Sequence, residues 1–287
     1  MSGVVTEFDD IYRNELNRHG YPFQDSVMRA AKELFEAGRS PWIFRAAEFP
    51  VGVRGRVTHI DFILEHRSKR LFLIAECKRA NPALSKWCFA RNAFTVRNPR
   101  NSRLILQAAW LSGTATNRFL TGISTETSEQ IYHLAIEIKS NKKGDAQGQP
   151  KGEAFEKAGE QVCLGVNGMV EFFAGHPHLV PEGGKIHLVP VIFTTAQIFT
   201  SEIDLGSANL ESGELDNIQA NQTSRPWIWW QHNVSPTLVH GQAVRPIARS
   251  MESVLEQEFS RSIAIVSSQG IESFLGRDWW LDSELAV

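Results

Sequence analysis

Hydrophobic and polar positions between residues 57 and 79 predict two neighbouring strands. Residues 57–65 alternate between apolar and polar side chains, and residues 71–75 are five apolar residues that run directly into Glu76. The polar segment 66–70 between them predicts a turn. We therefore expect an antiparallel strand pair, and the rest of the chain is interpreted around it.

The same patterns predict elements on both sides of this pair. Apolar residues at helical spacing indicate a helix over 27–37, with Asp25 or Ser26 as its N-cap and Gly38 ending it. A strand is expected at 42–49, followed by a glycine-containing turn up to Arg56. Later segments predict a short helix at 104–111, a strand at 131–139, a helix at 153–173, a strand at 186–195 and a helix from Ser250 to Ile265.

The predicted strand pair carries Asp61, Glu76 and Lys78. Fourteen residues separate Asp61 from Glu76, and residues of an antiparallel pair share a face when an even number separates them. Lys78 lies two residues further and joins that face. Burying these charges costs several kcal/mol unless they pair or bind a metal, and oxygen ligands of this kind suit Mg²⁺ or Mn²⁺. The alternative is a structural ion-pair cluster where the strands meet solvent.

Asp61 followed by Glu76-Cys77-Lys78 at the end of the next strand resembles the signature of the PD-(D/E)xK nuclease superfamily. The resemblance implies an α/β fold of the restriction-endonuclease-like type, with an αβββαβ core and a central mixed sheet flanked by helices. It also implies that Asp61, Glu76 and the backbone carbonyl of Cys77 bind the metal, and that Lys78 orients or activates the attacking water. Ile60 stands where the full motif has proline.

Four further residues are candidates for accessory roles. Relatives of this superfamily place an acidic or amide residue on the first helix, and Gln24 and Asp25 occupy that region here, although capping also explains Asp25. Some place a glutamine on the helix after the catalytic strands, where this chain has Gln161. Glu48, near the end of the first strand, is a further carboxylate that we consider for the metal site.

Charge is unevenly distributed along the chain. Residues 66–125 contain eleven Lys and Arg but one acidic residue, Glu76, while the whole chain has a formal net charge of −2. Such a basic segment favours a polyanion, because neutralising phosphates dominates nucleic-acid affinity. We expect DNA as the partner, with RNA left open. The candidate phosphate-contacting residues are Arg54, Arg56, Arg79, Arg97, Arg100 and Arg103. Arg54 and Arg56 equally fit solvated turn charges.

A second Glu-x-Lys sequence occurs at Glu137-Ile138-Lys139. Here apolar and polar residues alternate over 131–139, which is typical of a strand with one solvated face. No acidic residue precedes it at a spacing that suits a hairpin partner. We therefore interpret Glu137 and Lys139 as surface residues and prefer the first site.

Length and composition set the wider expectations. The chain has 287 residues, of which 42% are hydrophobic. We expect a nuclease core over 1–200 with a basic insertion at 80–130, and a C-terminal extension over 201–287 that packs on the core or mediates self-association as a homodimer. Three cysteines without a CxxC motif favour a reducing cytoplasm over a disulfide framework. No apolar run predicts membrane insertion.

The sequence thus leads to a Mg²⁺-dependent nuclease that hydrolyses DNA phosphodiester bonds, with a restriction or phage-defence role and a partner subunit or activator as further expectations. The alternative is a catalytically inactive module of the same fold that binds nucleic acid or a partner protein. Thiol or serine catalysis has little support, since Cys77 is expected to face away from Glu76 and no Gly-x-Ser-x-Gly elbow occurs.

Overall fold

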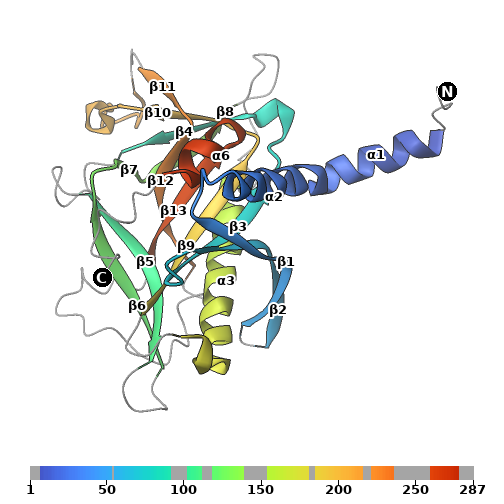
Figure 1. The fold of residues 1–287 in the computed structure, drawn as a ribbon. Coiled ribbons are helices and arrows are strands. Elements are labelled where there is room, and N and C mark those ends of the chain that lie inside the picture. Colours follow the sequence, from blue (N-terminus) through green and yellow to red (C-terminus); the bar gives the residue numbers. More distant parts are fainter. Residues whose placement is uncertain are drawn as a thin grey trace.

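A mixed sheet packed between helices forms most of the molecule (Figure 1). The structure is a computed structural model that describes residues 7–53, 55–91, 102–111, 118–138, 154–180, 185–215, 221–235 and 259–277. Within these ranges the chain is a mixed α/β protein with one large sheet and a second, smaller one.

Nine strands form the large sheet in the described part of the chain. They are β1 (Trp42–Val53), β2 (Arg56–His66), β3 (Leu71–Lys78), β5 (Ser102–Leu111), β6 (Arg118–Thr127), β7 (Ile131–Tyr132), β9 (Lys185–Thr194), β12 (Trp227–Asn233) and β13 (Ser260–Ser267).

The centre of the large sheet has the order β1-β2-β3-β9-β13-β12-β7. Strands β1, β2 and β3 form an antiparallel meander, whereas β9 runs parallel to β3 and β13 runs parallel to β9. A parallel neighbour requires a crossover connection, and the chain makes it here through α3 (Ala154–Gly175). Residues 107–110 of β5 pair with the first residues of β9, 185–188, and β5 pairs with β6 along its whole length.

Helices cover both faces of this sheet and create two cores. On one face, α3 packs against Ile74 and Ile192, and on the other face α2 (Tyr21–Glu36) and α6 (Ile271–Leu275) pack against Leu73 and Val191. Side chains of β3 therefore alternate between the two cores, as a buried strand requires. The helix α1 (Glu7–His19) precedes α2 and projects away from the body (Figure 1).

Glycines let α3 lie close to the sheet. A Cβ added at Gly168 would stand 2.4 Å from Cγ2 of Val51, and one added at Gly165 would stand 3.1 Å from Cγ1 of Ile60. Both distances are shorter than ordinary van der Waals contact, so a larger side chain at Gly168 would push the helix outward. The close approach fixes the position of every side chain that α3 presents to the strand ends.

A smaller sheet has the order β11-β10-β4-β8. Its strands are β4 (Lys86–Ala90), β8 (Leu134–Ile138), β10 (Gln197–Ser201) and β11 (Gln222–Arg225). Trp87 and Phe89 of β4 are fully buried and contact Phe155 at the start of α3. This sheet thus covers the first turn of α3. No helix in the described residues is long and apolar enough to cross a membrane.

Several elements agree with the sequence-based predictions. The pair β2 and β3, the helices α2 and α3, and the strand β9 all lie where the patterns place them. The N-cap assignment is wrong, because α2 begins at Tyr21 with Gly20 preceding it, and Asp25 and Ser26 lie inside the helix. The first strand also continues through the expected turn to Val53.

Two predicted helices are wrong in the described residues. Segment 104–111 belongs to β5, and the part of the predicted C-terminal helix after 259 forms β13. Residues 263–266 are buried on both faces of the large sheet, so no alternation distinguishes the strand from a buried helix. Strands β12 and β13, from the region expected to be a C-terminal extension, continue the large sheet.

Candidate active site

The end of the ladder between β2 and β3 brings Asp61, Glu76 and Lys78 to one place. The last paired residues of the two strands are Phe62 and Ala75, and one further step in this register places Asp61 opposite Glu76. The paired ladder ends there, so the strands part where the two carboxylates lie. On its other side β3 continues alongside β9 as far as Lys78, which pairs with Thr194.

The backbone N–H and carbonyl of Cys77 point toward Asp61. The carbonyl of Lys78 accepts the N–H of Thr195 across the β9 side, at 3.3 Å. Neighbouring residues of a strand point their backbone groups to opposite sides, so the N–H and carbonyl of Cys77 point toward β2. The Cys77 N–H accordingly donates to Oδ2 of Asp61 at 2.6 Å. The Cys77 carbonyl, which is the expected third metal ligand, therefore points toward the side of β3 on which Asp61 lies.

Burial and like charge dominate the electrostatics of the two carboxylates. Glu76 is only 6% exposed. Its pKa is raised to about 8, first by burial and then by the negative charge of Asp61, with Lys78 opposing the shift. Burial also raises the pKa of Asp61 to about 6, although the hydrogen bond from Cys77 lowers it. The Lys78 ammonium lies 4.0 Å from Oε1 of Glu76, which is too far to compensate for the burial.

Lys78 is held by a residue from α3. Its Nζ donates to Oε1 of Gln161 at 3.2 Å, across 83 positions of the chain. Gln161 is otherwise exposed and occupies the first half of the helix that Gly165 and Gly168 bring close to the sheet. The structure therefore places Gln161, which the resemblance had made a candidate accessory residue, in contact with Lys78.

Gln24 and Glu48 lie beside Asp61 and are hydrogen-bonded to each other. Nε2 of Gln24, a buried residue of α2, donates to Oε1 of Glu48 at 2.5 Å and to the backbone carbonyl of Asp61 at 3.2 Å. The negative charge of Glu48 raises the pKa of both Asp61 and Glu76. Gln24 thus connects the first long helix of the body to the strand that carries Asp61.

The backbone of Glu48 has an unusual conformation. Its φ of 48° lies in the left-handed region, which is rare for residues other than glycine and costs about 1–3 kcal/mol. Flanking residues Ala47 and Phe49 pair with Phe62 and Ile60, so Glu48 lies opposite Asp61. No sequence pattern indicates this irregularity.

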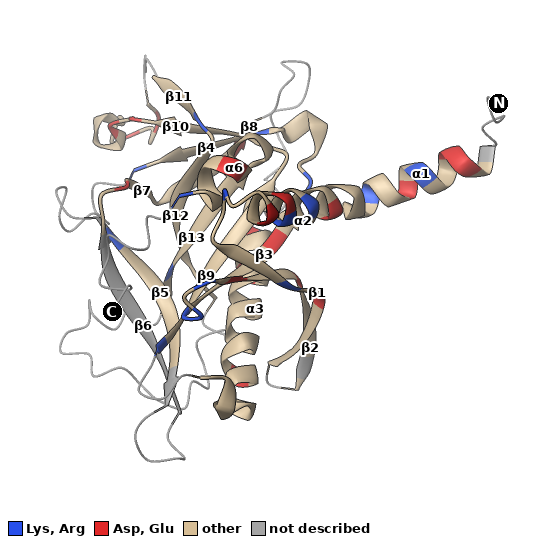
Figure 2. Cartoon of the chain, viewed as in Figure 1, with Lys and Arg blue, Asp and Glu red and all other residues tan. Residues whose placement is uncertain are grey.

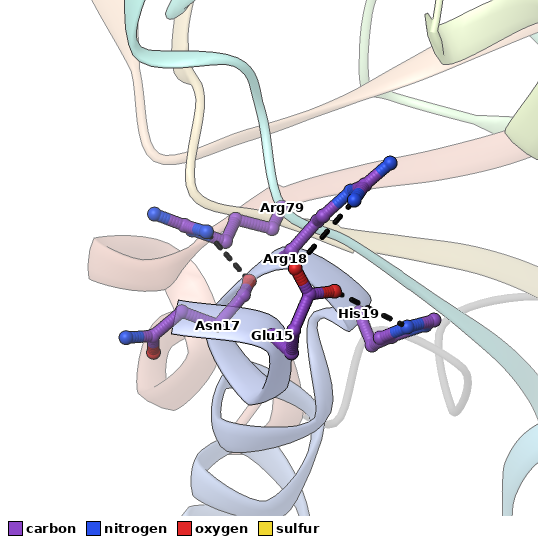
Figure 3. A network of polar contacts seen from close by, with 5 residues as sticks. All are labelled: Glu15, Asn17, Arg18, His19 and Arg79. Atoms are coloured by element: carbon purple, nitrogen blue, oxygen red, sulfur yellow. Dashed lines mark hydrogen bonds and ion pairs between the residues drawn. The ribbon is translucent and has the colours of Figure 1, made fainter. Parts of the chain in front are cut away.

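Other predicted residues lie elsewhere. Asp25 forms an ion pair with Arg29 on the exposed face of α2. Arg79, next to Lys78, donates from Nη1 to the carbonyl of Asn17 at the end of α1, at 2.5 Å (Figure 3). Arg103 is exposed on β5. Arg54, Arg97 and Arg100 lie outside the described residues, as does the side chain of Arg56.

The basic segment does not gather around Glu76 in the described structure. Arg67, Lys69 and Arg70 lie in the turn before β3, at the opposite end of that strand from Glu76. Glu76 is six residue steps along the extended chain from Arg70, a distance of about 20 Å. Among the described basic residues of this segment, Lys78 and Arg79 are the ones at the site end of β3.

The second Glu-x-Lys sequence has a structural explanation, but not the one predicted. Leu134 and Ile136 of β8 are the exposed residues, whereas Glu137 points inward. Its Oε1 accepts the N–H of Ala154, the first residue of α3, at 3.0 Å. Glu137 therefore supplies the acceptor that the helix start needs. Lys139 lies outside the described residues.

The donor set fits a hard divalent cation. Within the described residues no group of three or more His, Cys, Asp and Glu side chains is arranged to hold a metal ion. Asp61, Glu76 and the Cys77 carbonyl would instead provide a small oxygen set, as Mg²⁺ prefers when water and substrate phosphate complete its ligands. The raised pKa values of both carboxylates show negative charge crowded in a poorly solvated place, which a cation would relieve.

Comparison of the chain with protein-family models, with curated proteins and with solved structures found no match. Sequence and geometry therefore carry the functional argument by themselves.

Proposed function

We propose that this chain is a metal-dependent nuclease that hydrolyses DNA phosphodiester bonds, with an active site of the PD-(D/E)xK type. The observation that carries the proposal is the set of side chains at the end of β3. The buried carboxylate of Glu76 and the half-buried carboxylate of Asp61 face each other where the paired ladder ends, and the neighbouring ammonium is positioned by Gln161. The ion pair of Lys78 with Glu76, at 4.0 Å, does not offset the burial of Glu76, whose pKa stays raised to about 8.

The arrangement of elements supports the same proposal. The helix α2, the meander β1-β2-β3, the helix α3 and the parallel strand β9 follow one another in the order αβββαβ. Strands β4 to β8 are inserted between β3 and α3. The resemblance named from Asp61 and Glu76-Cys77-Lys78 implies the same order of elements, although element order alone does not determine function.

Each residue would have a distinct part in the reaction. Asp61, Glu76 and the Cys77 carbonyl would hold Mg²⁺ or Mn²⁺, which supplies stabilisation of the charge that develops on the scissile phosphate. Lys78, held by Gln161, would donate hydrogen bonds to the attacking water or to a phosphate oxygen. Gln24 and Glu48 would fix the backbone of Asp61.

Two parts of the proposal rest on the resemblance alone. They are a role in restriction or phage defence and cutting as a homodimer, with a partner subunit or activator as a further requirement. The basic segment favours a nucleic acid as the substrate.

Cleavage of DNA tests the proposal. Plasmid and linear duplex would be incubated with Mg²⁺ or Mn²⁺ and the wild type, Asp61→Asn, Glu76→Gln or Lys78→Ala. Asp25→Asn is the matched control, because it makes the same carboxylate-to-amide change on an exposed face of α2. We expect the three site variants to lose about 10³-fold or more in cleavage rate while keeping DNA binding in a gel-shift assay, and the control to cut normally.

Other outcomes separate the alternatives. Binding of DNA by the wild type without cleavage, with any metal, would support the inactive binding module of the same fold. Cleavage of single-stranded RNA of the same sequence, and not of DNA, would keep the site and change the substrate.

A further inference from the structure

The junction between α1 and α2 is attached to the end of β3. The backbone carbonyl of Asn17, in the last turn of α1, accepts the N–H of Gly20 at 3.3 Å and Nη1 of Arg79 at 2.5 Å (Figure 3). Gly20 has a φ of 81°, and a Cβ added there would lie 4.0 Å from Cβ of Arg79, which is an ordinary contact distance. The residue that follows Lys78 therefore holds the junction directly.

The same junction is connected to Asp61 through the first turn of α2. The carbonyl of Gly20 accepts the N–H of Gln24 at 3.2 Å. Nε2 of Gln24 donates to the carbonyl of Asp61 at 3.2 Å, and Oδ2 of Asp61 accepts the N–H of Cys77 at 2.6 Å. Cys77 is two residues before Arg79. These hydrogen bonds thus form a closed ring of contacts that begins and ends in the last residues of β3.

Asp61 lies where regular strand pairing supports it least. The ladder between β2 and β3 ends at Phe62 and Ala75. On its other side Asp61 lies opposite Glu48, whose φ of 48° interrupts the extended conformation of β1. Because the residues of a functional site must be held within about 0.5 Å of their working geometry, the ring of contacts has a part to play at this position.

Two simpler roles for Arg79 are a phosphate contact and a cap for α1. Acidic and basic residues both lie along α1 (Figure 2), and in its last turn Glu15 lies 3.6 Å from Arg18 and 4.0 Å from His19 (Figure 3). The surface beside Arg79 is therefore not of one sign, as a phosphate-binding surface would be. The carbonyl that a cap would satisfy already accepts the N–H of Gly20.

We propose that Arg79 is a positioning residue for the metal site, which acts through the α1–α2 junction and Gln24 to hold Asp61 opposite Glu76. The inference rests on the proposed metal site and adds to it a residue that contacts neither the metal nor the reacting phosphate. It follows that loss of the Arg79 guanidinium weakens metal binding even when no DNA is present.

Binding of Mn²⁺ without DNA, measured by isothermal titration calorimetry, tests the proposal. Arg79→Met keeps the stem of the side chain beside Gly20 and removes its hydrogen-bond donors, and we expect the dissociation constant to rise about tenfold. Arg18→Met is the matched control, because it makes the same change in the last turn of α1 at a side chain that is 79% exposed. Normal Mn²⁺ binding by Arg79→Met would overturn the proposal, and weaker DNA binding by that variant would then assign Arg79 to phosphate contact.

A double-mutant cycle tests the connection through Gln24. Gln24→Leu alone is expected to weaken Mn²⁺ binding about 10- to 100-fold, and adding Arg79→Met should change the dissociation constant by less than about twofold more. If the two losses instead multiply, Arg79 acts independently of Gln24 and the proposed connection is wrong.

Hydrogen exchange of the metal-free protein separates this inference from the proposed function. The N–H of Cys77 reports its hydrogen bond to Asp61, and it should exchange at least about tenfold faster in Arg79→Met than in the wild type or Arg18→Met. The N–H of Val191, in the buried strand β9, is the internal reference, because global unfolding would speed both. A wild type that binds no Mn²⁺ would refute the metal site, whereas unchanged exchange at Cys77 in Arg79→Met would overturn the positioning role itself.

Discussion

The chain contains two Glu-x-Lys sequences, and their surroundings differ in almost every respect. Glu137 of β8 accepts the backbone N–H of Ala154 and thereby supports the start of α3. Glu76 of β3 is more deeply buried and lies near Asp61 and Glu48, whose charges raise its pKa. Both sequences are connected to α3, the first through Lys78 and Gln161 and the second through Ala154.

We interpret this difference as that between a structural carboxylate, Glu137, and a carboxylate of the proposed metal site, Glu76. Burial raises the pKa of Glu137 as well, but the hydrogen bond from the Ala154 N–H opposes this shift. Glu76 loses solvation and gains negative neighbours, which destabilises the protein unless a cation binds. Perturbed carboxylates of this kind concentrate at functional sites.

Among the changes that test this comparison, the largest effect is expected from breaking the contact between Lys78 and Gln161, which should slow DNA cleavage. Gln161→Leu would leave the ammonium without its anchor, and we expect cleavage to fall about 10- to 100-fold, as is usual for residues that orient a catalytic group. Single-turnover cleavage would measure the change. Glu171→Gln, on an exposed position of the same helix, is the control and should leave cleavage unchanged. An active Gln161→Leu enzyme would show that Lys78 does not depend on this anchor.

Removing the charge of Glu76 should stabilise the metal-free protein by about 1–2 kcal/mol near pH 8. Its pKa rises on folding from 4.5 to about 8, so its contribution to stability is present below pH 4.5 and is lost as the pH rises toward 8. Asp61 acts in the same direction between pH 3.8 and about 6.

Urea unfolding of the wild type and of Glu76→Gln between pH 5 and 8.5 would measure this effect. The stability advantage of the variant should grow as the pH rises, and Mg²⁺ at pH 8 should stabilise the wild type alone. If the free energies of unfolding of the two proteins change with pH in the same way, burial does not raise the pKa of Glu76 as described.

Removing the acceptor at Glu137 should destabilise the protein by about 1 kcal/mol, the usual cost of a lost helix cap. Glu137→Ala deletes the acceptor for Ala154, whereas Glu137→Gln keeps an oxygen there and should cost less. Thermal unfolding of the two variants would show the difference, and cleavage by the folded protein should be unchanged in both. A large loss of cleavage in Glu137→Gln would mean that the second Glu-x-Lys sequence also takes part in the reaction.

The smallest expected effect concerns the backbone near the first Glu-x-Lys sequence. Because Glu48 has a φ of 48°, Glu48→Gly should be more stable than Glu48→Ala by about 0.5–1 kcal/mol. Denaturant midpoints of the two variants would measure the difference. Gly52→Ala in the same strand is a reference for replacing glycine where φ is not positive. A Glu48→Ala variant as stable as Glu48→Gly would show that the strained conformation is not retained in solution.

The sequence predicted the relative position of Asp61 and Glu76 better than it predicted the elements around them. The alternation of apolar residues and the even number of residues between Asp61 and Glu76 correctly predicted that the two lie opposite each other on paired strands, because β2 and β3 are neighbours both in sequence and in space. The connection of Gln161 to Lys78 depends on how closely α3 approaches the sheet, which a local pattern does not reveal.

The wrong predictions for β5 and β8 arise because elements distant in the sequence bury these strands. Residues 104–109 are buried on both faces of β5, and their pattern therefore lacks the alternation that identifies a strand. In β8 the apolar residues Leu134 and Ile136 are exposed, since the small sheet turns Ala135 and Glu137 toward the core around α3. A local pattern indicates that faces alternate, but neighbouring elements decide which face is buried.

Binding of Mn²⁺ by the wild type, Glu76→Gln and Glu137→Gln at pH 7.5, measured by isothermal titration calorimetry, tests the central claim most directly. Our account predicts a site that the wild type and Glu137→Gln share and that Glu76→Gln loses. Equal binding by all three proteins, or loss in Glu137→Gln alone, would contradict the assignment of Asp61, Glu76 and the Cys77 carbonyl as a metal site.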